Sequence, residues 1–447
     1  MPENKDTIVA IATPPGRGGI GVVRVSGDKS KEIYSALTGK KPIARQAQYV
    51  AFKTSSQEII DKGIGLFFQE PASYTGEDVI ECHTHGSRVL LEMLLEEIVS
   101  LGARPAKPGE FTERAFLNDK IDLVQAEAVA DLIDSNSKKA VRSAMQSLDG
   151  VFSKKVNELR ELVFTSRALI EAALDFPDEE DVEVDIAPAI NNAKHALSEV
   201  KTLLGKAEAG RVLAQNPTIV IAGLPNAGKS CLINYLSGYD SAIVSPEAGT
   251  TRDIIRENVL LGDYAVTLID TAGLRDTSNA IEKEGVERSI KALKTADIVL
   301  YVVDNSVTSE LDSDEANKYI PTEIKKLVVK NKIDLSEIET FNNTKDTVYI
   351  SAKTGKGISD LINMVSDMLN LSQSDENIIF ARQRHVDALS FVKQQLIQVI
   401  NAADKNVGLE VLAESLRQAL TGFDDITGRT TADDVLGKVF SQFCIGK

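Results

Sequence analysis

A glycine-rich octapeptide directly after a short apolar run constrains this chain more than any other feature. Residues 223–230 read Gly-Leu-Pro-Asn-Ala-Gly-Lys-Ser and match the pattern G-x-x-x-x-G-K-[ST], while residues 218–222 form a compact β-type run. We expect a helix from residue 230 to 236. Glycines let backbone N–H groups approach an anion, and the helix N-terminus adds partial positive charge. The pattern predicts a phosphate-binding loop in which Lys229 contacts the β- and γ-phosphates and Ser230 binds Mg²⁺.

Three further short motifs, each placed after an apolar run, complete this pattern. They are Asp270-Thr271-Ala272-Gly273, Asn331-Lys332-Ile333-Asp334 and Ser351-Ala352-Lys353. We expect Asp270 at a strand end near the metal, with the N–H of Gly273 facing the γ-phosphate. The carboxylate of Asp334 can accept N1–H and N2–H of guanine, which adenine lacks, so it selects GTP over ATP. Four motifs in this order predict a GTPase related to the translation factors.

Apolar β-type runs alternate with helical stretches between residues 217 and 371, which is typical of a doubly wound parallel sheet. The predicted strands are 218–222, 264–269, 298–303, 326–329 and 347–350. The predicted helices around this block are 151–174, 386–400 and 409–420, and residues 121–133 also show helical spacing. In residues 1–118 we expect strands at 7–11, 21–25 and 64–68 and a helix at 87–101.

The fold class is therefore multidomain, with an α+β block followed by a helical domain into which a Ras-like α/β domain is inserted. The predicted domains are 1–118, 119–215 (first half of the helical domain), 216–374 (the inserted GTPase domain) and 375–447 (second half of the helical domain). Insertion needs chain ends that lie close together, which is common in compact domains.

Composition narrows the possible partners and compartment. Fifty Lys and Arg residues against 66 Asp and Glu give a net charge of −16, which disfavours an extended nucleic-acid surface but not a local basic groove. Three cysteines far apart in the sequence fit a reducing cytosol. The sequence has no apolar run long enough for a membrane span and no signal-peptide pattern, so we expect a cytoplasmic protein without a span.

The residue that positions the attacking water is not fixed by the motifs. Leu274 stands where Ras-like GTPases have a glutamine, and leucine cannot hydrogen-bond. The polar residues just downstream are Arg275, Asp276, Glu282 and Glu284. Thr251 lies in a segment expected to act as a mobile switch and is a candidate second Mg²⁺ ligand. No arginine finger is evident.

Motifs outside the GTPase block carry a family resemblance. They are residues 108–118 (PGEFTERAFLN), 120–129 (KIDLVQAEAV), 175–177 (DFP) and 443–447 (FCIGK). Over nearly its full length the chain resembles the MnmE (TrmE) family of tRNA uridine-5-carboxymethylaminomethyl modification GTPases. It departs from that pattern at Asp119, where glycine is frequent, and at Cys231, where serine or threonine is usual.

The resemblance implies a potassium-activated GTPase that modifies C5 of wobble uridine 34 in certain tRNAs, adding a carboxymethylaminomethyl or aminomethyl group. It implies a flavin-dependent partner, MnmG (GidA), and a one-carbon unit from 5,10-methylenetetrahydrofolate, of which 5-formyltetrahydrofolate is an analogue. Glycine or ammonium would supply the nitrogen. The N-terminal domain would bind folate and form a homodimer, and two G domains would meet in the GTP state.

The resemblance also assigns roles to residues. It implies Glu282 as the catalytic glutamate, which orients the water. Potassium would be held by Asn226, Ser245, Glu247 and Thr250. Folate would contact Arg24, Glu81, Lys120 and Lys447. Together with the motifs, the expected nucleotide contacts are Asn226, Ala227, Gly228, Lys229, Ser230, Cys231, Ser245, Thr250, Thr251, Asp270, Thr271, Ala272, Gly273, Asn331, Lys332, Asp334, Ser351 and Ala352.

Two alternatives stay open at this point, and a third, a zinc site, is disfavoured. A GTP-controlled assembly factor that docks on ribosomal RNA would carry the same motifs, although it would usually add a basic appendage. From the residues alone, a solvated or salt-bridged strand face is the preferred interpretation of Arg24, and only the resemblance favours a ligand site. The tetrapeptide Cys82-His83-Thr84-His85 is too tightly spaced for a structural zinc site, and no second cluster exists, so we expect no zinc there.

Overall fold

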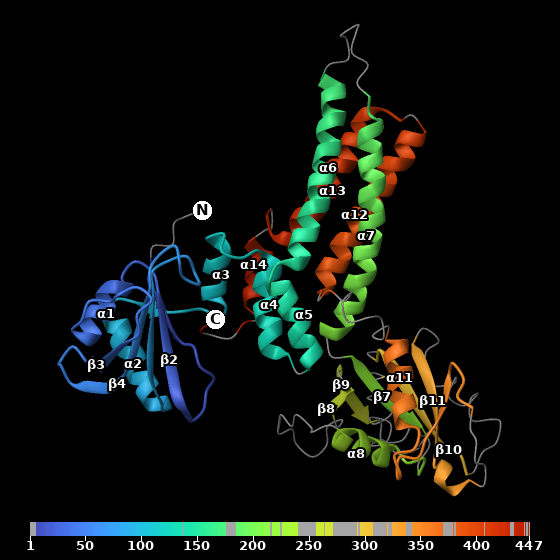
Figure 1. Ribbon diagram of the computed structural model, residues 1–447, viewed down its shortest axis with the longest axis horizontal. Helices are drawn as coiled ribbons and strands as arrows, with labels where there is room; N and C mark the ends of the chain where they lie inside the picture. The colour runs from blue at the N-terminus through green and yellow to red at the C-terminus, as the bar shows by residue number, and fades with distance from the viewer. Residues whose placement is uncertain are drawn as a thin grey trace, which may run out of the picture. The chain divides into compact units, whose positions relative to one another are not determined.

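The computed structural model describes most of the chain, and Figure 1 shows its helices and strands. The described residues are 6–135, 137–175, 185–214, 217–223, 226–239, 256–262, 264–270, 293, 296–306, 320, 324–336, 342–369, 379, 381–405, 407–429, 433–441, 443 and 446. They fall into two compact units, which are described separately. One comprises Met1–Ala130 with Phe423–Lys447, and the other comprises Asp131–Gly422.

The first unit contains a six-stranded sheet of order β3-β4-β5-β2-β1-β6. Its strands are β1 (Ile8–Ile11), β2 (Gly18–Ser26), β3 (Gln48–Lys53), β4 (Ile59–Phe68), β5 (Val79–Gly86) and β6 (Arg104–Pro105). Neighbours pair antiparallel, except that β1 and β6 are parallel. The three strands predicted in this block are confirmed. The strand predicted at 7–11 is β1, which begins one residue later, and those at 21–25 and 64–68 are parts of β2 and β4.

Two helices pack on one face of this sheet, α1 (Ser30–Thr38) and α2 (Arg88–Ser100). Their apolar side chains, including Leu37 and Leu94, share a core with Val23 of β2 and Cys82 of β5. The helix predicted at 87–101 is confirmed, one residue shorter at each end. Because strand side chains alternate between faces, Arg24 and Glu81 must point away from this core.

The first unit also contains α3 (Glu110–Leu117), the start of α4 (Leu123–Asp134), the end of α13 (Leu409–Thr427) and α14 (Asp433–Phe440). Phe440 and Leu436 of α14 pack with Leu123 of α4 in one apolar cluster. Residues 423–447 thus group with the N-terminal block, whereas we had placed them in the helical domain. The predicted domain bounds stay predictions. Asp119 adopts φ 54°, a left-handed conformation that glycine tolerates best and that explains the glycine frequent there.

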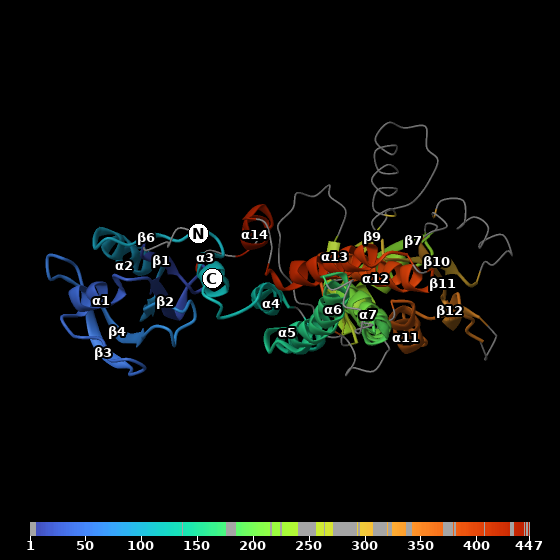
Figure 2. The ribbon, with the colours of Figure 1, turned by 90° about the horizontal axis from the view of Figure 1, so that it is seen from above.

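The second unit has a helical part made of α5 (Lys138–Leu148), α6 (Val151–Asp175), α7 (Ala187–Ala214), α12 (Gln383–Asp404) and most of α13. Helix α7 packs against both α6 and α12, and Figures 1 and 2 show the three side by side. A Cβ on Gly422 would lie 2.6 Å from Cγ2 of Val392, so α13 crosses α12 closely. Helices from before and after the α/β block therefore pack together, as insertion of that block requires.

The α/β part of this unit is a six-stranded sheet of order β12-β11-β10-β7-β9-β8. Its strands are β7 (Thr218–Gly223), β8 (Arg256–Leu261), β9 (Tyr264–Asp270), β10 (Ile298–Asp304), β11 (Lys325–Asn331) and β12 (Thr347–Tyr349), accompanied by helices α8 (Lys229–Tyr239) and α11 (Ile358–Met368). All five predicted strands are confirmed within two residues at each end. The sheet is not purely parallel, because β8 pairs antiparallel with β9.

The antiparallel edge has a simple cause. Residues 262 and 263 alone join β8 to β9, and Gly262 adopts φ 62°. A connection this short makes a hairpin, whereas parallel strands need a crossover of a dozen or more residues. The sequence pattern did not mark 256–261 as a strand. Among the described residues, no helix has the length and apolar composition needed to cross a membrane.

Candidate nucleotide site

The phosphate-binding loop fits tightly against the carboxyl ends of β10 and β11. Gly223 adopts φ 140°, and a Cβ there would lie 2.1 Å from the carbonyl oxygen of Val302. Gly228 adopts φ 95°, and its Cβ would lie 2.3 Å from Nδ2 of Asn331. Asn226 also has positive φ, at 63°. Glycine at 223 and 228 is therefore required by close packing as well as by backbone conformation.

Asn331 links this loop to the Ser-Ala-Lys loop. Its Nδ2 donates to the carbonyl of Ala227 at 2.9 Å, and its Oδ1 accepts from the backbone N–H of Ala352 at 2.9 Å. The residue is 2% exposed. The expected nucleotide residue thus holds two loops in register, which is a positioning role.

Asp334, the predicted guanine acceptor, is exposed beside Ser351. Its Oδ1 accepts a hydrogen bond from Oγ of Ser351 at 2.6 Å. That hydroxyl in turn accepts from the backbone N–H of Thr354 at 3.2 Å. The Asn-Lys-Ile-Asp and Ser-Ala-Lys motifs are therefore brought together.

Lys332 has a partner that the motif did not reveal. Its Nζ lies 2.5 Å from Oδ2 of Asp304, the last residue of β10. Burial acts to raise the pKa of Asp304, but hydrogen bonds from Lys332 and Ser306 outweigh it, so the pKa is lowered. Asp304 is the last residue of an apolar strand, just as Asp270 is. That position in the sequence could have identified Asp304 as a residue of the nucleotide site.

Lys229 and Asp270 form the charged end of the loop. Nζ of Lys229 donates to the carbonyl of Gly223 at 2.9 Å. Burial lowers the pKa of Lys229, an effect that Asp270 opposes. Burial raises the pKa of Asp270, with Lys229 acting to lower it and Glu257 to raise it.

A divalent cation fits beside Asp270. Its Oδ1 is buried and has no hydrogen-bond partner among the described residues. An unpartnered buried carboxylate oxygen is costly, and carboxylate and hydroxyl oxygens are the ligands that Mg²⁺ prefers. Ser230 is the second residue of α8 and carries the predicted hydroxyl.

Of the remaining expected contacts, one lies on α8 and the others lie outside the described residues. Cys231 is exposed on α8 and is a free thiol. The expected residues that lie outside the described ranges are Ser245, Glu247, Thr250, Thr251, Thr271, Ala272, Gly273, Glu282 and Lys447.

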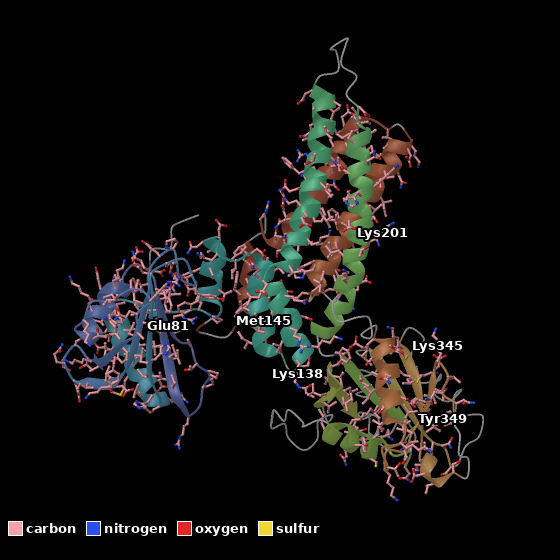
Figure 3. The ribbon with its side chains drawn as sticks, in the orientation of Figure 1. Glu81, Lys138, Met145, Lys201, Lys345 and Tyr349 are labelled. Carbon is pink, nitrogen blue, oxygen red and sulfur yellow. The ribbon has the colours of Figure 1, made fainter. Side chains whose placement is uncertain are left out.

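A second polar site lies on the sheet of the first unit. Arg24 and Glu81 face each other across β2 and β5, with Nε and Nη2 of Arg24 at 3.0 and 2.9 Å from Oε1 of Glu81. Nε2 of His83 lies 3.1 Å from Oε2 of the same carboxylate, which Figure 3 labels. The hydrogen bond from His83 lowers the pKa of Glu81 and Arg24 adds to this, while burial opposes both.

Aromatic rings surround this ion pair. The guanidinium carbon of Arg24 lies 5.7 Å from the ring centre of Tyr74 and 5.8 Å from that of Phe111. Nζ of Lys120 donates to the carbonyl of Pro71 at 2.9 Å, so Lys120 rests on the loop that carries Tyr74. Sequence reasoning missed Tyr74 altogether.

His83 was also missed as a neighbour of Glu81, although alternation along one strand places both on one face. Cys82 and His85, from the same tetrapeptide, lie in other environments. Cys82 is buried in the core, where burial raises the pKa of its thiol to about 12, and Nδ1 of His85 lies 3.0 Å from Asp61. No group of three metal-binding side chains occurs in the part of the chain that the structure describes.

The 108–118 motif has a structural explanation. Arg114 is 4% exposed, and its Nη2 donates to Oδ1 of Asp6 at 2.6 Å. Its Nη1 lies 3.1 Å from Oε2 of Glu77. Glu110, one turn earlier, accepts from Arg104 at 2.9 Å. Arg114 and Glu110 are buried, and their ion pairs join α3 to β6 and to the residues just before β1 and β5.

The glycine-rich loop between β7 and α8, with Asp270 at the end of β9 and the charged residues that follow β11, defines an α/β domain of the guanine-nucleotide-binding class. Comparison with known proteins identifies the family. A model described as the MnmE helical domain matches residues 123–444, and one described as the GTP-binding protein TrmE N-terminus matches residues 7–120.

Curated relatives match the whole chain. The tRNA modification GTPase MnmE of Legionella pneumophila (strain Paris) is 46% identical over 445 residues, which cover 99% of each chain. That of Photobacterium profundum is 44% identical over 455 residues, which cover 100% of each. The chain therefore belongs to the MnmE family of tRNA modification GTPases, and it is a GTP hydrolase. Among solved structures, the G domain of the T. maritima FeoB iron transporter is 24% identical and covers 34% of this chain and 98% of its own, with a TM-score of 0.27.

Proposed function

We propose that this chain couples GTP hydrolysis to modification of C5 of wobble uridine 34 in tRNA, together with a flavin-dependent MnmG (GidA) partner. The product carries a carboxymethylaminomethyl or aminomethyl group, and glycine or ammonium supplies its nitrogen. The observation that supports the proposal is the full-length match to MnmE relatives, together with a nucleotide site whose loops are joined through Asn331. The chain acts in the cytoplasm as a homodimer that forms through its N-terminal domain.

In this proposal the guanine base binds between Asp334 and Lys332, and Lys229 contacts the phosphates. Mg²⁺ neutralises phosphate charge when bound. Ser230 and Thr251 would ligate it, and the unpartnered oxygen of Asp270 supports a cation at this position. Glu282 orients the attacking water, because Leu274 cannot. Glu282→Ala should therefore reduce GTP turnover severely and leave nucleotide affinity nearly unchanged. If turnover persists, Glu284 or Asp276 takes its place.

Potassium would supply the positive charge that an arginine finger supplies elsewhere. Its proposed ligands are Asn226, Ser245, Glu247 and Thr250. Asn226 is exposed, and its side chain makes no hydrogen bond within the described ranges, so its neutral oxygen is open to a cation. GTP hydrolysis should be faster in K⁺ than in Na⁺ at equal ionic strength, and Asn226→Ala should abolish that difference while nucleotide binding persists. A wild-type rate indifferent to the cation contradicts this part.

The polar site of the first unit is proposed to bind 5,10-methylenetetrahydrofolate. A carboxylate such as Glu81 can accept the N3–H and 2-amino group of a pterin, and Tyr74 and Phe111 offer aromatic faces beside it. Lys120 and the tail residue Lys447 complete the proposed contacts. The test ligand is the stable analogue 5-formyltetrahydrofolate.

Mass spectrometry of wobble uridines in tRNA from a strain lacking this protein tests the main proposal. Loss of the modified uridine, restored by the wild-type chain and not by Asp334→Asn, supports it. Unchanged wobble uridines together with a defect in ribosomal subunit assembly would favour the alternative, a GTP-controlled factor that docks on ribosomal RNA.

A further inference from the structure

A lysine-lined groove of about 400 Å³ lies between α6 and α7 in the second unit. The polar side chains that line it are Lys154, Lys155, Glu158, Glu199, Thr202 and Lys206. Helix α6 contributes the first three and α7 the rest. None of them belongs to the nucleotide site.

Only part of the positive charge in this groove is neutralised. Nζ of Lys155 lies 2.7 Å from Oε2 of Glu199 and 3.9 Å from Oε2 of Glu158. The side chains of Lys154 and Lys206 make no hydrogen bond or ion pair with any residue that the structure describes. Lys206 interacts electrostatically with Glu199 without a direct ion pair. Three lysines against two glutamates leave the groove with a net positive charge for an external anion.

The surrounding sequence is basic within a strongly acidic chain. Residues 138–155 contain five basic side chains and one acidic one, whereas the whole chain has a net charge of −16. Helix α5 ends at Leu148 and α6 begins at Val151, so the cations of α5 lie within a few turns of the groove. Figure 3 locates Lys138 on α5 and Lys201 on α7. Lys138, Arg142 and Lys201 are exposed, and their side chains likewise pair with nothing in the described ranges.

We propose that this groove, with the cations of α5 that precede it, contacts the phosphodiester backbone of tRNA; the inference rests on the proposed function. Lysine and arginine bind nucleic acid mainly through phosphates, and such contacts position the RNA without reading bases. The acidic remainder of the chain repels RNA, so binding concentrates where the local charge is reversed. Glu158 and Glu199 limit the strength of the contact, which suits a substrate that must be released.

Charge reversal in the groove tests the proposal on the full chain. Lys154→Glu/Lys206→Glu should weaken binding of tRNA, measured by fluorescence anisotropy, by about tenfold or more at 150 mM salt. The slope of log affinity against log salt should become shallower by about 1.4–1.8, which corresponds to two phosphate contacts. GTP turnover without tRNA should not change.

Two further variants keep the test independent of folding. Lys62→Glu/Lys345→Glu changes two exposed and unpaired lysines elsewhere by the same charge and should leave tRNA affinity unchanged within about twofold. Glu158→Gln removes negative charge from the groove and should tighten tRNA binding severalfold. Tightening cannot result from misfolding.

Each contrary outcome has a clear meaning. Equal loss in both double variants would show a net-charge effect and overturn the proposal. Unchanged tRNA binding together with weaker binding of the flavoprotein partner would assign the groove to a protein and overturn the RNA assignment. If the deletion strain loses the modified uridine while the groove variants bind tRNA normally, the proposed function stands and this inference fails. If the deletion strain keeps the modified uridine, the proposed function is contradicted, whatever the groove binds.

Discussion

The nucleotide site and the Arg24–Glu81 site both present a carboxylate suited to a ring that carries adjacent N–H donors, but they hold it differently. Asp334 is exposed and accepts one hydrogen bond, from the hydroxyl of Ser351. The side chain of Glu81 is only 17% exposed and is held by Arg24 and His83. The Asp334 carboxylate can accept hydrogen bonds from a ligand directly, whereas a ligand at Glu81 must compete with the donors of Arg24 and His83.

This difference predicts where each site derives its affinity. If guanine binds at Asp334, its two N–H donors add hydrogen bonds to the one that Ser351 donates. At Glu81 the gain is smaller, because existing bonds are exchanged for new ones. Substitutions at the nucleotide site should therefore affect binding more, and those at Glu81 should affect the unit's own stability as well.

Asp334→Asn tests the larger half of this comparison. The amide replaces one acceptor oxygen by a donor, which then faces one of the two guanine donors. We expect GDP affinity to fall by about a hundredfold or more, because each lost bond to a charged group contributes roughly 1.5–3 kcal/mol. Xanthosine diphosphate should bind the variant better than GDP does, since its base offers an acceptor where guanine has its amino group. Calorimetric titration with both nucleotides measures this, and unchanged GDP affinity would remove Asp334 from the site.

Asn331→Ala tests whether the loops depend on one buried link. Truncation leaves the carbonyl of Ala227 and the N–H of Ala352 without their partner, and we expect the free energy of unfolding to fall by about 2–4 kcal/mol. The matched control is Asn343→Ala, which also loses hydrogen bonds to a side chain and a backbone N–H but at an exposed position. It should cost less than about 1 kcal/mol. Denaturant unfolding followed with and without GDP compares them, and equal costs would contradict the positioning role.

Much of the nucleotide site could be predicted from sequence because each motif is contiguous. The residues of one loop keep their order, and parallel strands bring their carboxyl ends to one edge. The link from Asn331 to Ala227 could not be predicted, since it joins residues 104 positions apart through side-chain geometry. The ion pair between Lys332 and Asp304 could not be predicted either, because it too depends on side-chain geometry between distant residues.

The N-terminal site shows the opposite case. Arg24 and Glu81 come together only through the register of β2 on β5, and a shift of one strand by one residue would put the two side chains on opposite faces of the sheet. Composition and spacing do not fix register. The family resemblance named the two residues but neither His83 nor Tyr74, and only His83 could have been found from the alternation along its strand. The hairpin strand β8 was missed because its sequence mixes charged and apolar residues.

Glu81→Gln tests the second site through acid stability. The folded pKa of Glu81 lies below its ordinary value of 4.5, so its contribution is complete above that pH and is lost as the pH falls through the folded value. Wild-type stability should therefore fall more steeply than that of Glu81→Gln below about pH 4.5, by less than about 1.4 kcal/mol per pH unit, the slope of one proton. Denaturant unfolding between pH 6 and 3 measures the difference. The variant should also bind 5-formyltetrahydrofolate more weakly, and parallel acid curves would show that the pair with Arg24 and His83 contributes no stability.

Asp304→Asn should have the smallest effect on binding. It tests whether an ion pair fixes a side chain of the nucleotide site, as Arg24 and His83 fix Glu81 in the other site. The pair between Asp304 and Lys332 is partly exposed, with side chains 21% and 30% accessible, so its own contribution is small. If the pair fixes Lys332 where the base binds, the variant should bind GDP about two- to fivefold more weakly, the range expected for an exposed ion pair. The change should shrink at high salt, because salt screens exposed charges. Asp346→Asn, at an exposed carboxylate that pairs with nothing in the described ranges, is the control and should bind GDP like the wild type. Tighter GDP binding by Asp304→Asn would show that Asp304 competes with the base for Lys332. In both sites a ligand would then have to displace an ion pair of the protein.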